Sequence, residues 1–173
     1  MYITRVVTGV NGSAGSLQAL RYAAEMARMH DAELVPAYAW TPPGGDIADR
    51  RFPNHELREV WKSAARDRLC QAVELGIGGP PGELKFGPRI IRGEAGPALI
   101  DLASQPGDLL VIGAGRHGAV GRSLSARTAR YCLGHAACPV IAVPPDELAH
   151  PAHGLHGWTD RHRLHPKDVA GVS

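Results

Sequence analysis

The sequence contains no long hydrophobic run. No stretch of its 173 residues approaches the roughly 18 consecutive apolar residues that a membrane-spanning helix needs. The first ten residues, MYITRVVTGV, enter a strand pattern at once and show no signal-peptide cleavage region. We therefore expect no membrane segment and a cytoplasmic location.

The sequence also lacks a strong excess of charge of one sign. It carries 19 Lys and Arg against 17 Asp and Glu, a net charge of +2, and the two signs are mixed through most of the chain. Domains that bind nucleic acid usually gather positive charge on one face. We therefore expect no nucleic-acid partner.

Cysteine is scarce, and catalytic patterns are missing. The three cysteines, Cys70, Cys132 and Cys138, are odd in number and lack the spacing of a metal site. This favours reduced, buried thiols over disulfides. His117 and His135 have no serine, cysteine or aspartate partner in the local sequence. The sequence therefore predicts a protein that is not an enzyme and that holds no metal.

What the sequence does contain is a regular alternation of strand and helix patterns. The expected strands are short apolar or β-branched runs, and the expected helices carry apolar residues three and four positions apart. Strands are expected at Arg5–Val10, Leu34–Trp40, Leu84–Arg92, Asp108–Ile112 and Val140–Val143. Helices are expected over 14 to 30, at Asn54–Gly76, from Gly96 onward, and at Ser123–His135. This order predicts an α/β fold in which four helices cover both faces of an open, five-stranded parallel sheet.

Proline and glycine separate these elements. Thr41–Pro53 is rich in both residues and is expected to form a long loop. Gly87 and Pro88 interrupt the third strand, and because proline cannot donate to a strand ladder, this strand is expected at an edge of the sheet. Pro97 is expected at the first position of the helix that it opens.

Residues 146–173 differ in composition from the rest of the chain. They hold five of the nine histidines and show little apolar periodicity. We expect one domain over residues 1–145 and an extended or disordered His-rich arm over residues 146–173. Histidines recur at every third position from His150 to His156. On a helix, histidines at this spacing could bind one metal together, but Pro151 and Gly154 between them oppose helix formation.

The most informative segment is Leu109–Val143. An apolar run ends in the turn GAGRHG, and a helix pattern and a second apolar run follow. Turns in this position lie where open α/β sheets bind ligands. Basic residues crowd the turn and the helix start: Arg116, His117, Arg122, Arg127 and Arg130. An anion site built on side chains and a solvated loop whose arginines pair with acidic residues both remain open.

Three segments carry a family resemblance. They are VVTGVNGSAGSLQALRYAAEMA near the start, the turn VIGAGRHG, and HAACPVIAVP at the close. With them the chain resembles the universal stress protein family over about Ile3–Pro144. The resemblance implies a doubly wound, three-layer sheet of order 3-2-1-4-5 and a homodimer formed around the last strand, Val140–Val143. An apolar terminal strand would otherwise leave an exposed sheet edge.

One branch of this family binds ATP. Its members carry an Asp after the first strand and a motif of glycine, two residues, glycine, nine residues, then Gly-Ser or Gly-Thr. The glycines let backbone N–H groups close on phosphate oxygens at a helix start. Aligned on the closing Cys-Pro pair, Gly113 matches the first glycine. The remaining motif positions hold Arg116, Ala126 and Arg127, and Asn11 replaces the Asp.

The candidate ligand-binding residues follow the first and fourth strands and begin the last helix. They are Gly9, Val10, Asn11, Ile112, Gly113, Gly115, Arg116, Arg127 and Thr128. Asn11 keeps hydrogen-bonding capacity toward adenine or ribose, or it forms a turn ahead of Ser13. Two functions are therefore expected as alternatives. The first is a stress-response module that dimerises and contacts partners, with weak or absent ATP binding. The second is a stress protein that binds adenine nucleotide, with ATP as the candidate cofactor, through an arginine-rich anion site.

Overall fold

The computed structural model of the chain describes residues 2–51, 53–115 and 124–144. The elements in this part are β1 (Arg5–Gly9), α1 (Ala14–His30), β2 (Glu33–Trp40), α2 (Gly45–Arg51), α3 (His55–Ile77), β3 (Arg89–Arg92), α4 (Ala95–Leu102), β4 (Asp108–Gly113), α5 (Leu124–His135) and β5 (Val140–Val143). The strands form one parallel sheet in the order β3-β2-β1-β4-β5. Both the α/β fold and the strand order are confirmed.

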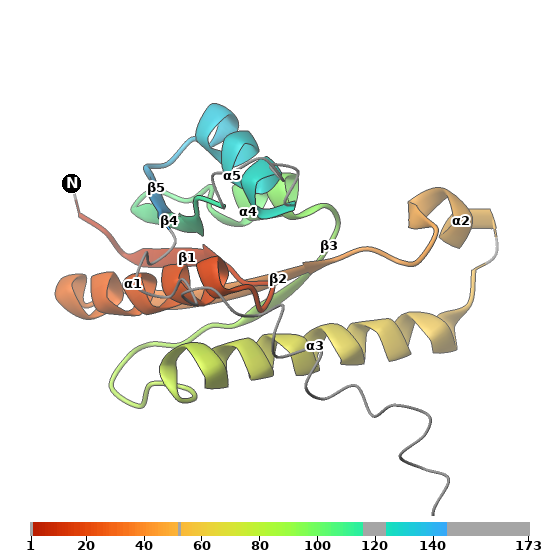
Figure 1. The fold of residues 1–173 in the computed structure, drawn as a ribbon, viewed down its shortest axis with the longest axis horizontal. Helices are drawn as coiled ribbons and strands as arrows, with labels where there is room; N and C mark the ends of the chain where they lie inside the picture. The colour runs from red at the N-terminus through yellow and green to blue at the C-terminus, as the bar shows by residue number, and fades with distance from the viewer. Residues whose placement is uncertain (1, 52, 116–123, 145–173) are drawn as a thin grey trace, which may run out of the picture.

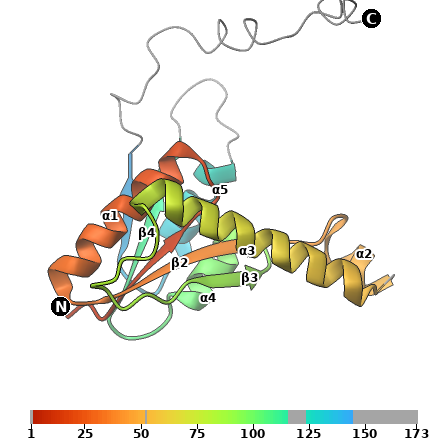
Figure 2. The same ribbon diagram turned by 90° about the horizontal axis from the view of Figure 1, so that it is seen from below.

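Helices α1, α3, α4 and α5 lie in two layers, one on each face of the sheet, and α2 lies beyond its edge (Figures 1 and 2). Helices α1 and α3 pack on one face, over a cluster that includes Val6, Leu20 and Leu34. Helices α4 and α5 pack on the other, over a cluster that includes Val7 and Leu110. Because successive strand residues point to opposite faces, neighbouring valines of β1 serve the two cores. The three-layer architecture is therefore also confirmed.

Helix α1 shows how the local sequence sets these elements. Ser13 is its N-cap and accepts a hydrogen bond at Oγ from the N–H of Ser16, at 3.3 Å. Asp31 closes the helix with a left-handed φ of 49° and donates its N–H to the last turn. The buried face is built mainly from alanines, Ala19, Ala23, Ala24 and Ala27, so the helix backbone lies close against the sheet.

Strand β3 lies at an edge, as predicted, but it is shorter than the expected Leu84–Arg92. The backbone of Leu34 bonds to the segment that precedes β3. Because backbone groups alternate in direction along a strand, the nitrogen of Pro36 points the same way. Pro36 has no N–H to donate, and the register places Pro88 next to it. Pro36 therefore interrupts the ladder, which resumes at Arg89, while the nitrogen of Pro88 faces the open edge of the sheet.

The expected loop over Thr41–Pro53 is wrong in its middle, where helix α2 forms, so the expectation of four helices is also wrong. Gly44 and Gly45 adopt φ of 82° and 77° and turn the chain into this helix. A seven-residue helix with glycine at its start carries little periodic signal. It is held instead by contacts with residues far along the sequence, described below.

Helix α4 begins two residues before Pro97 rather than at it, with Glu94 at the N-cap. Pro97 is thus the third helical residue, not the first. The first N–H groups of a helix have no partner within it, so proline is tolerated there.

Helix α3 is confirmed, but only its second half covers the sheet. Its buried residues all lie from Ala65 onward. Its first turns, capped by the Asn54 side chain on the N–H of Leu57 at 3.0 Å, project with α2 past the edge of the sheet (Figures 1 and 2). We call α2 together with residues 55–64 of α3 the arm.

Candidate functional site

The candidate site lies at the carboxyl ends of β1 and β4. These strands are neighbours, yet the chain leaves them toward opposite edges of the sheet, β1 toward β2 and β4 toward β5. Open α/β sheets bind ligands at such a switch point. The fold brings together Gly9, Val10, Asn11, Ile112, Gly113 and Gly115, which come from two distant parts of the sequence.

The end of β1 is tied to its surroundings. The N–H of Val10 donates to the carbonyl of Ala37 at 2.9 Å, so the strand pairing continues one residue beyond β1. A side chain at Gly9 would place a Cβ 2.6 Å from a methyl group of Leu99 on α4. This glycine therefore allows α4 to approach the sheet.

Asn11 forms the turn between β1 and α1. Its Oδ1 accepts a hydrogen bond from the N–H of Ser13 at 3.0 Å, and its own N–H donates to Oγ of Ser16 at 3.3 Å. Aspartate and asparagine side chains commonly hold the chain in this way. Asn11 therefore has the turn-forming role that the sequence offered as one of two alternatives.

Two glycines at the end of β4 are sites of close backbone approach. A Cβ on Gly113 would lie 2.7 Å from the carbonyl oxygen of Gly15, at the start of α1. Gly115 has a φ of 79°, and a Cβ there would lie 2.8 Å from the backbone of Ala126, at the start of α5. Both glycines are thus required by packing against helix starts, whether or not a ligand binds.

Helix α5 carries the remaining described candidates. Arg127 is exposed, and Thr128 is half-buried. Arg130 turns back on its own helix, and its Nε donates to the carbonyl of Ala126 at 3.3 Å. Arg116, His117 and Arg122 lie outside the described residues, so the basic cluster is placed only in part.

The two helices that begin at this edge favour negative charge. Neither α1 nor α5 has an acidic residue in its first turn. The free N–H groups at a helix start and the helix dipole both attract anions. The edge is therefore electrostatically suited to a phosphate or carboxylate.

His135 has a packing role in the described structure. Its ring stacks on Tyr131, with centroids 4.3 Å apart, and its Nδ1 lies 2.9 Å from the carbonyl oxygen of Tyr131. These contacts tie the last turn of α5 together.

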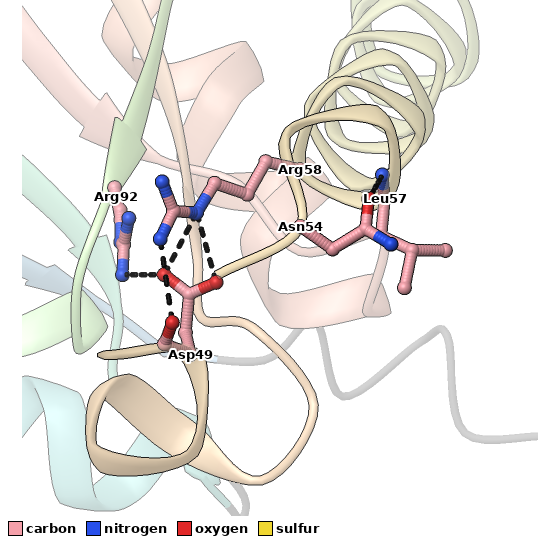
Figure 3. Close-up of polar contacts among 5 residues, drawn as sticks. All are labelled: Asp49, Asn54, Leu57, Arg58 and Arg92. Carbon is pink, nitrogen blue, oxygen red and sulfur yellow. Dashed lines mark hydrogen bonds and ion pairs between the residues drawn. The ribbon is translucent and has the colours of Figure 1, made fainter. Parts of the chain in front are cut away.

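A polar cluster that the sequence did not predict holds the arm (Figure 3). Asp49 of α2 is 5% exposed and accepts hydrogen bonds from Nε of Arg58 at 2.8 and 3.0 Å. Nη2 of Arg92, at the carboxyl end of β3, binds its Oδ2 at 2.7 Å. The guanidinium of Arg58, followed by that of Arg92, lowers the pKa of Asp49 despite the opposing effect of burial.

No local pattern predicts this cluster, because Arg58 and Arg92 are 9 and 43 residues from Asp49 and the three residues belong to three different elements. A buried carboxylate normally has such partners. The one available signal was Asp49 itself, an acidic residue that needs cationic partners if its segment is buried.

The cysteines fit the prediction only in part. Cys132 is buried, and desolvation raises the pKa of its thiol to about 11. Cys138 is half-buried, and burial raises its pKa as well. Cys70 is exposed on α3, so its expected burial is wrong. All three are free thiols, as expected.

Among the described residues no three His, Cys, Asp or Glu side chains come together as a metal site. No helix in the same part of the chain is both long and apolar enough to span a membrane.

A sequence model of the universal stress protein family matches residues 3–144. The chain belongs to the universal stress protein family. A universal stress protein of Mycolicibacterium smegmatis is 30% identical over 153 residues, covering 83% of this chain and 49% of that protein. The chain thus spans about half the length of this curated relative.

Solved structures of universal stress proteins share the fold. One, a universal stress protein in complex with cAMP, is 25% identical with a TM-score of 0.54, covering 84% of this chain and 100% of that one. UspA of Lactobacillus plantarum is 24% identical with a TM-score of 0.59, covering 83% of this chain and 99% of that one.

Proposed function

We propose that this universal stress protein acts without catalysis, through self-association and partner contacts, and binds ATP weakly or not at all. The observation that carries the proposal is the packing of Gly113 and Gly115 against Gly15 and Ala126. A phosphate cradle needs backbone N–H groups that a ligand can approach. At these two positions packing against the starts of α1 and α5 already accounts for the glycine, so neither glycine is a sign of a phosphate cradle.

Arg127 supports the same proposal. It stands where ATP-binding relatives of the family carry a serine or threonine, at the first turn of α5. A guanidinium attracts phosphate, but its length sets the charge away from the helix backbone, so it does not replace a short hydroxyl.

The alternative function is adenine nucleotide binding, and a specific observation favours it. The solved relative with cAMP shares the fold at 25% identity. The acid-free first turns of α1 and α5 also suit a single phosphate group. A nucleoside monophosphate is therefore the competing ligand, and the expected preference is for it over ATP.

Denaturing freshly purified protein and analysing the released small molecules tests this proposal. Calorimetric titration with ATP and magnesium, and separately with cAMP, follows. We expect no stoichiometric nucleotide on release and no saturable heat with ATP. Arg127→Ser serves as the matched variant and is expected to gain ATP affinity if the hydroxyl is what is missing. Stoichiometric adenine nucleotide in the purified protein would overturn the proposal.

The proposed dimer forms through β5. The carbonyls of Pro139, just before β5, and of Val143 accept bonds from the N–H groups of Leu110 and Ala114, so by alternation the backbone groups of Val140 and Ala142 face the open edge. Ala142→Pro removes an outward N–H and leaves the bonds to β4 in place. We expect light scattering to show a dimer for the natural chain and a monomer for this variant. A cooperative thermal melt of the variant is the control.

Cytoplasmic location and the His-rich arm at residues 146–173 stay predictions. Residues 146–173 lie outside the described residues, and the family match ends at residue 144. A chain ending at residue 145 is expected to melt cooperatively at an unchanged temperature.

A further inference from the structure

Two arginines converge on one carboxylate in the arm (Figure 3). Nε of Arg58 lies 2.8 Å from Oδ1 of Asp49, and Nη2 of Arg92 lies 2.7 Å from its Oδ2. The side chain of Asp49 is 3% exposed, whereas those of Arg58 and Arg92 are 33% and 39% exposed. Both guanidiniums therefore border solvent, while the carboxylate that they bind does not.

The two arginines lie on elements that are anchored in the body of the protein. Arg92 is the last residue of β3 and is in register with Trp40 of β2. The next residue, Gly93, donates its N–H to the carbonyl of Trp40 at 2.8 Å. Arg58 belongs to α3, a continuous helix with buried residues from Ala65 onward. The sheet and α3 therefore set the positions of both arginine backbones.

The carboxylate comes from an element that is held much less firmly. Helix α2 has seven residues, and among its described side chains Asp49 alone is buried. Ile47 of the same helix is 78% exposed. Gly44 and Gly45 lie at its start with positive φ, where glycine rotates more freely than other residues. Segments with few buried apolar contacts open at low cost, so α2 is the part of this cluster that can move.

A phosphate group fits the donors that now bind Asp49. The guanidinium fork binds carboxylates and phosphates with the same two-point geometry. A phosphate monoester carries a charge of about −1.5 to −2 at neutral pH and three strong acceptor oxygens, more of both than a carboxylate. The advantage of Asp49 is that it belongs to the same chain and is always nearby. The two groups therefore compete for Arg58 and Arg92.

We propose that Arg58 and Arg92 form a binding site for the phosphate group of a small molecule, and that Asp49 is an internal competitor which phosphate displaces as α2 moves away. A site that is open in only a fraction of the molecules binds its ligand with an affinity reduced by that fraction. Asp49 therefore sets the phosphate concentration at which the site fills. The site is distinct from the starts of α1 and α5 and does not depend on the proposed function.

Calorimetric titration of the full chain with inorganic phosphate, at constant ionic strength, tests the site. Asp49→Ala removes the competitor, so we expect phosphate to bind about tenfold more tightly than to the natural chain. Asp67→Ala makes the same change in net charge at an exposed position of α3, and its affinity is expected to match that of the natural chain. Equal affinities in the two variants, each with a cooperative thermal melt, overturn the proposal.

A second substitution in the Asp49→Ala chain locates the bound phosphate. Arg92→Gln in this chain is expected to abolish the gain in affinity, because it removes one of the two guanidiniums. Arg66→Gln, at an exposed position of α3, is the matched control and is expected to keep the gain. Phosphate bound at the starts of α1 and α5 does not distinguish these two chains. A gain that survives Arg92→Gln therefore contradicts the proposed site.

Amide exchange on the natural chain is an independent measurement that needs no substitution. Phosphate at concentrations that saturate the natural chain is expected to speed exchange in α2 and to leave β1 and β4 unchanged. Chloride at the same ionic strength is expected to leave all three elements unchanged. This measurement decides the question if Asp49→Ala does not fold. Exchange in α2 that is the same in phosphate and in chloride overturns the proposal.

Discussion

Arg5 and Asp108 join the first and fourth strands at their amino ends through a two-point ion pair. Nε and Nη2 of Arg5 lie 2.8 Å from the two carboxylate oxygens of Asp108, which is 1% exposed. The two residues are register partners in the parallel ladder. The N–H of Gln105 donates to the same carboxylate, so the buried charge is fully partnered.

Removing this charge is expected to be costly. Asp108→Asn leaves the Arg5 guanidinium without its counter-charge, and we expect the free energy of unfolding to fall by about 3 kcal/mol. Urea denaturation measures it. Asp101→Asn, an exposed change on α4, is the control and is expected to fall within about 0.5 kcal/mol of the natural chain. Equal stability of the two variants would contradict a stabilising role for the Arg5–Asp108 ion pair.

The Asp49 cluster predicts that the arm loosens in acid. The pKa of Asp49 is lowered in the folded chain from its usual 3.8, so the ionised form stabilises the fold. That contribution is complete above the usual pKa and is lost as pH falls through the lowered one. We expect a change in tryptophan fluorescence, reporting on Trp61 in the arm, below about pH 4.

Asp49→Asn is expected to remove this acid step and to speed amide exchange in α2 at neutral pH. Asp67→Asn, on the exposed side of α3, is the matched control and should keep both properties. An acid step of the same size in Asp49→Asn would show that another group causes it.

The close approach at Gly113 predicts opposite effects for two alanine substitutions. Gly113→Ala forces the backbones of β4 and α1 apart and is expected to lower the unfolding free energy by about 2 kcal/mol. Gly134→Ala, in α5 with open space at its Cβ position, is expected to raise it by about 0.5–1 kcal/mol. Thermal unfolding measures the change in stability of both variants. Unchanged stability in Gly113→Ala would mean that β4 and α1 lie farther apart than the structure places them.

Thr8 is the site of a stabilising substitution. Its side chain is fully buried in the central strand, and its hydroxyl oxygen has no hydrogen-bond partner in the described structure. Thr8→Val keeps the shape and removes the unpaired group, so we expect stability to rise by about 1–2 kcal/mol. Thr41→Val, at an exposed position, is the control. A fall in stability for Thr8→Val would reveal a partner for the hydroxyl.

The fold follows from the sequence wherever local pattern decides it. Apolar runs predict β1, β2, β4 and β5, and apolar residues three and four positions apart predict α1. Each of these elements buries a face, and the apolar residues of that face recur in the sequence at the expected spacing. The pattern fails at α2, which is stabilised by Asp49 reaching Arg58 and Arg92. Contacts between distant residues leave no periodic trace in a seven-residue helix.

The candidate site was predictable in position and less so in detail. The order of strands fixes the switch point beside β1 and β4, so Asn11 and Gly113 were placed at one edge. The use of Gly113 for packing against Gly15 was not visible, because glycine serves a ligand and a neighbouring backbone through the same missing side chain.

The two edges of the sheet differ in how they resist further growth. At one edge, β3 is four residues long, begins and ends with arginine, and follows the Gly87-Pro88 break. Charge on an edge strand is one of the features that prevent further strands from adding to it. At the other edge, β5 is equally short and follows Pro139, but it has only apolar residues within its length. If two copies pair through β5 as proposed, the charged β3 edges that remain oppose further strand addition, and the assembly ends as a closed pair instead of a fibre.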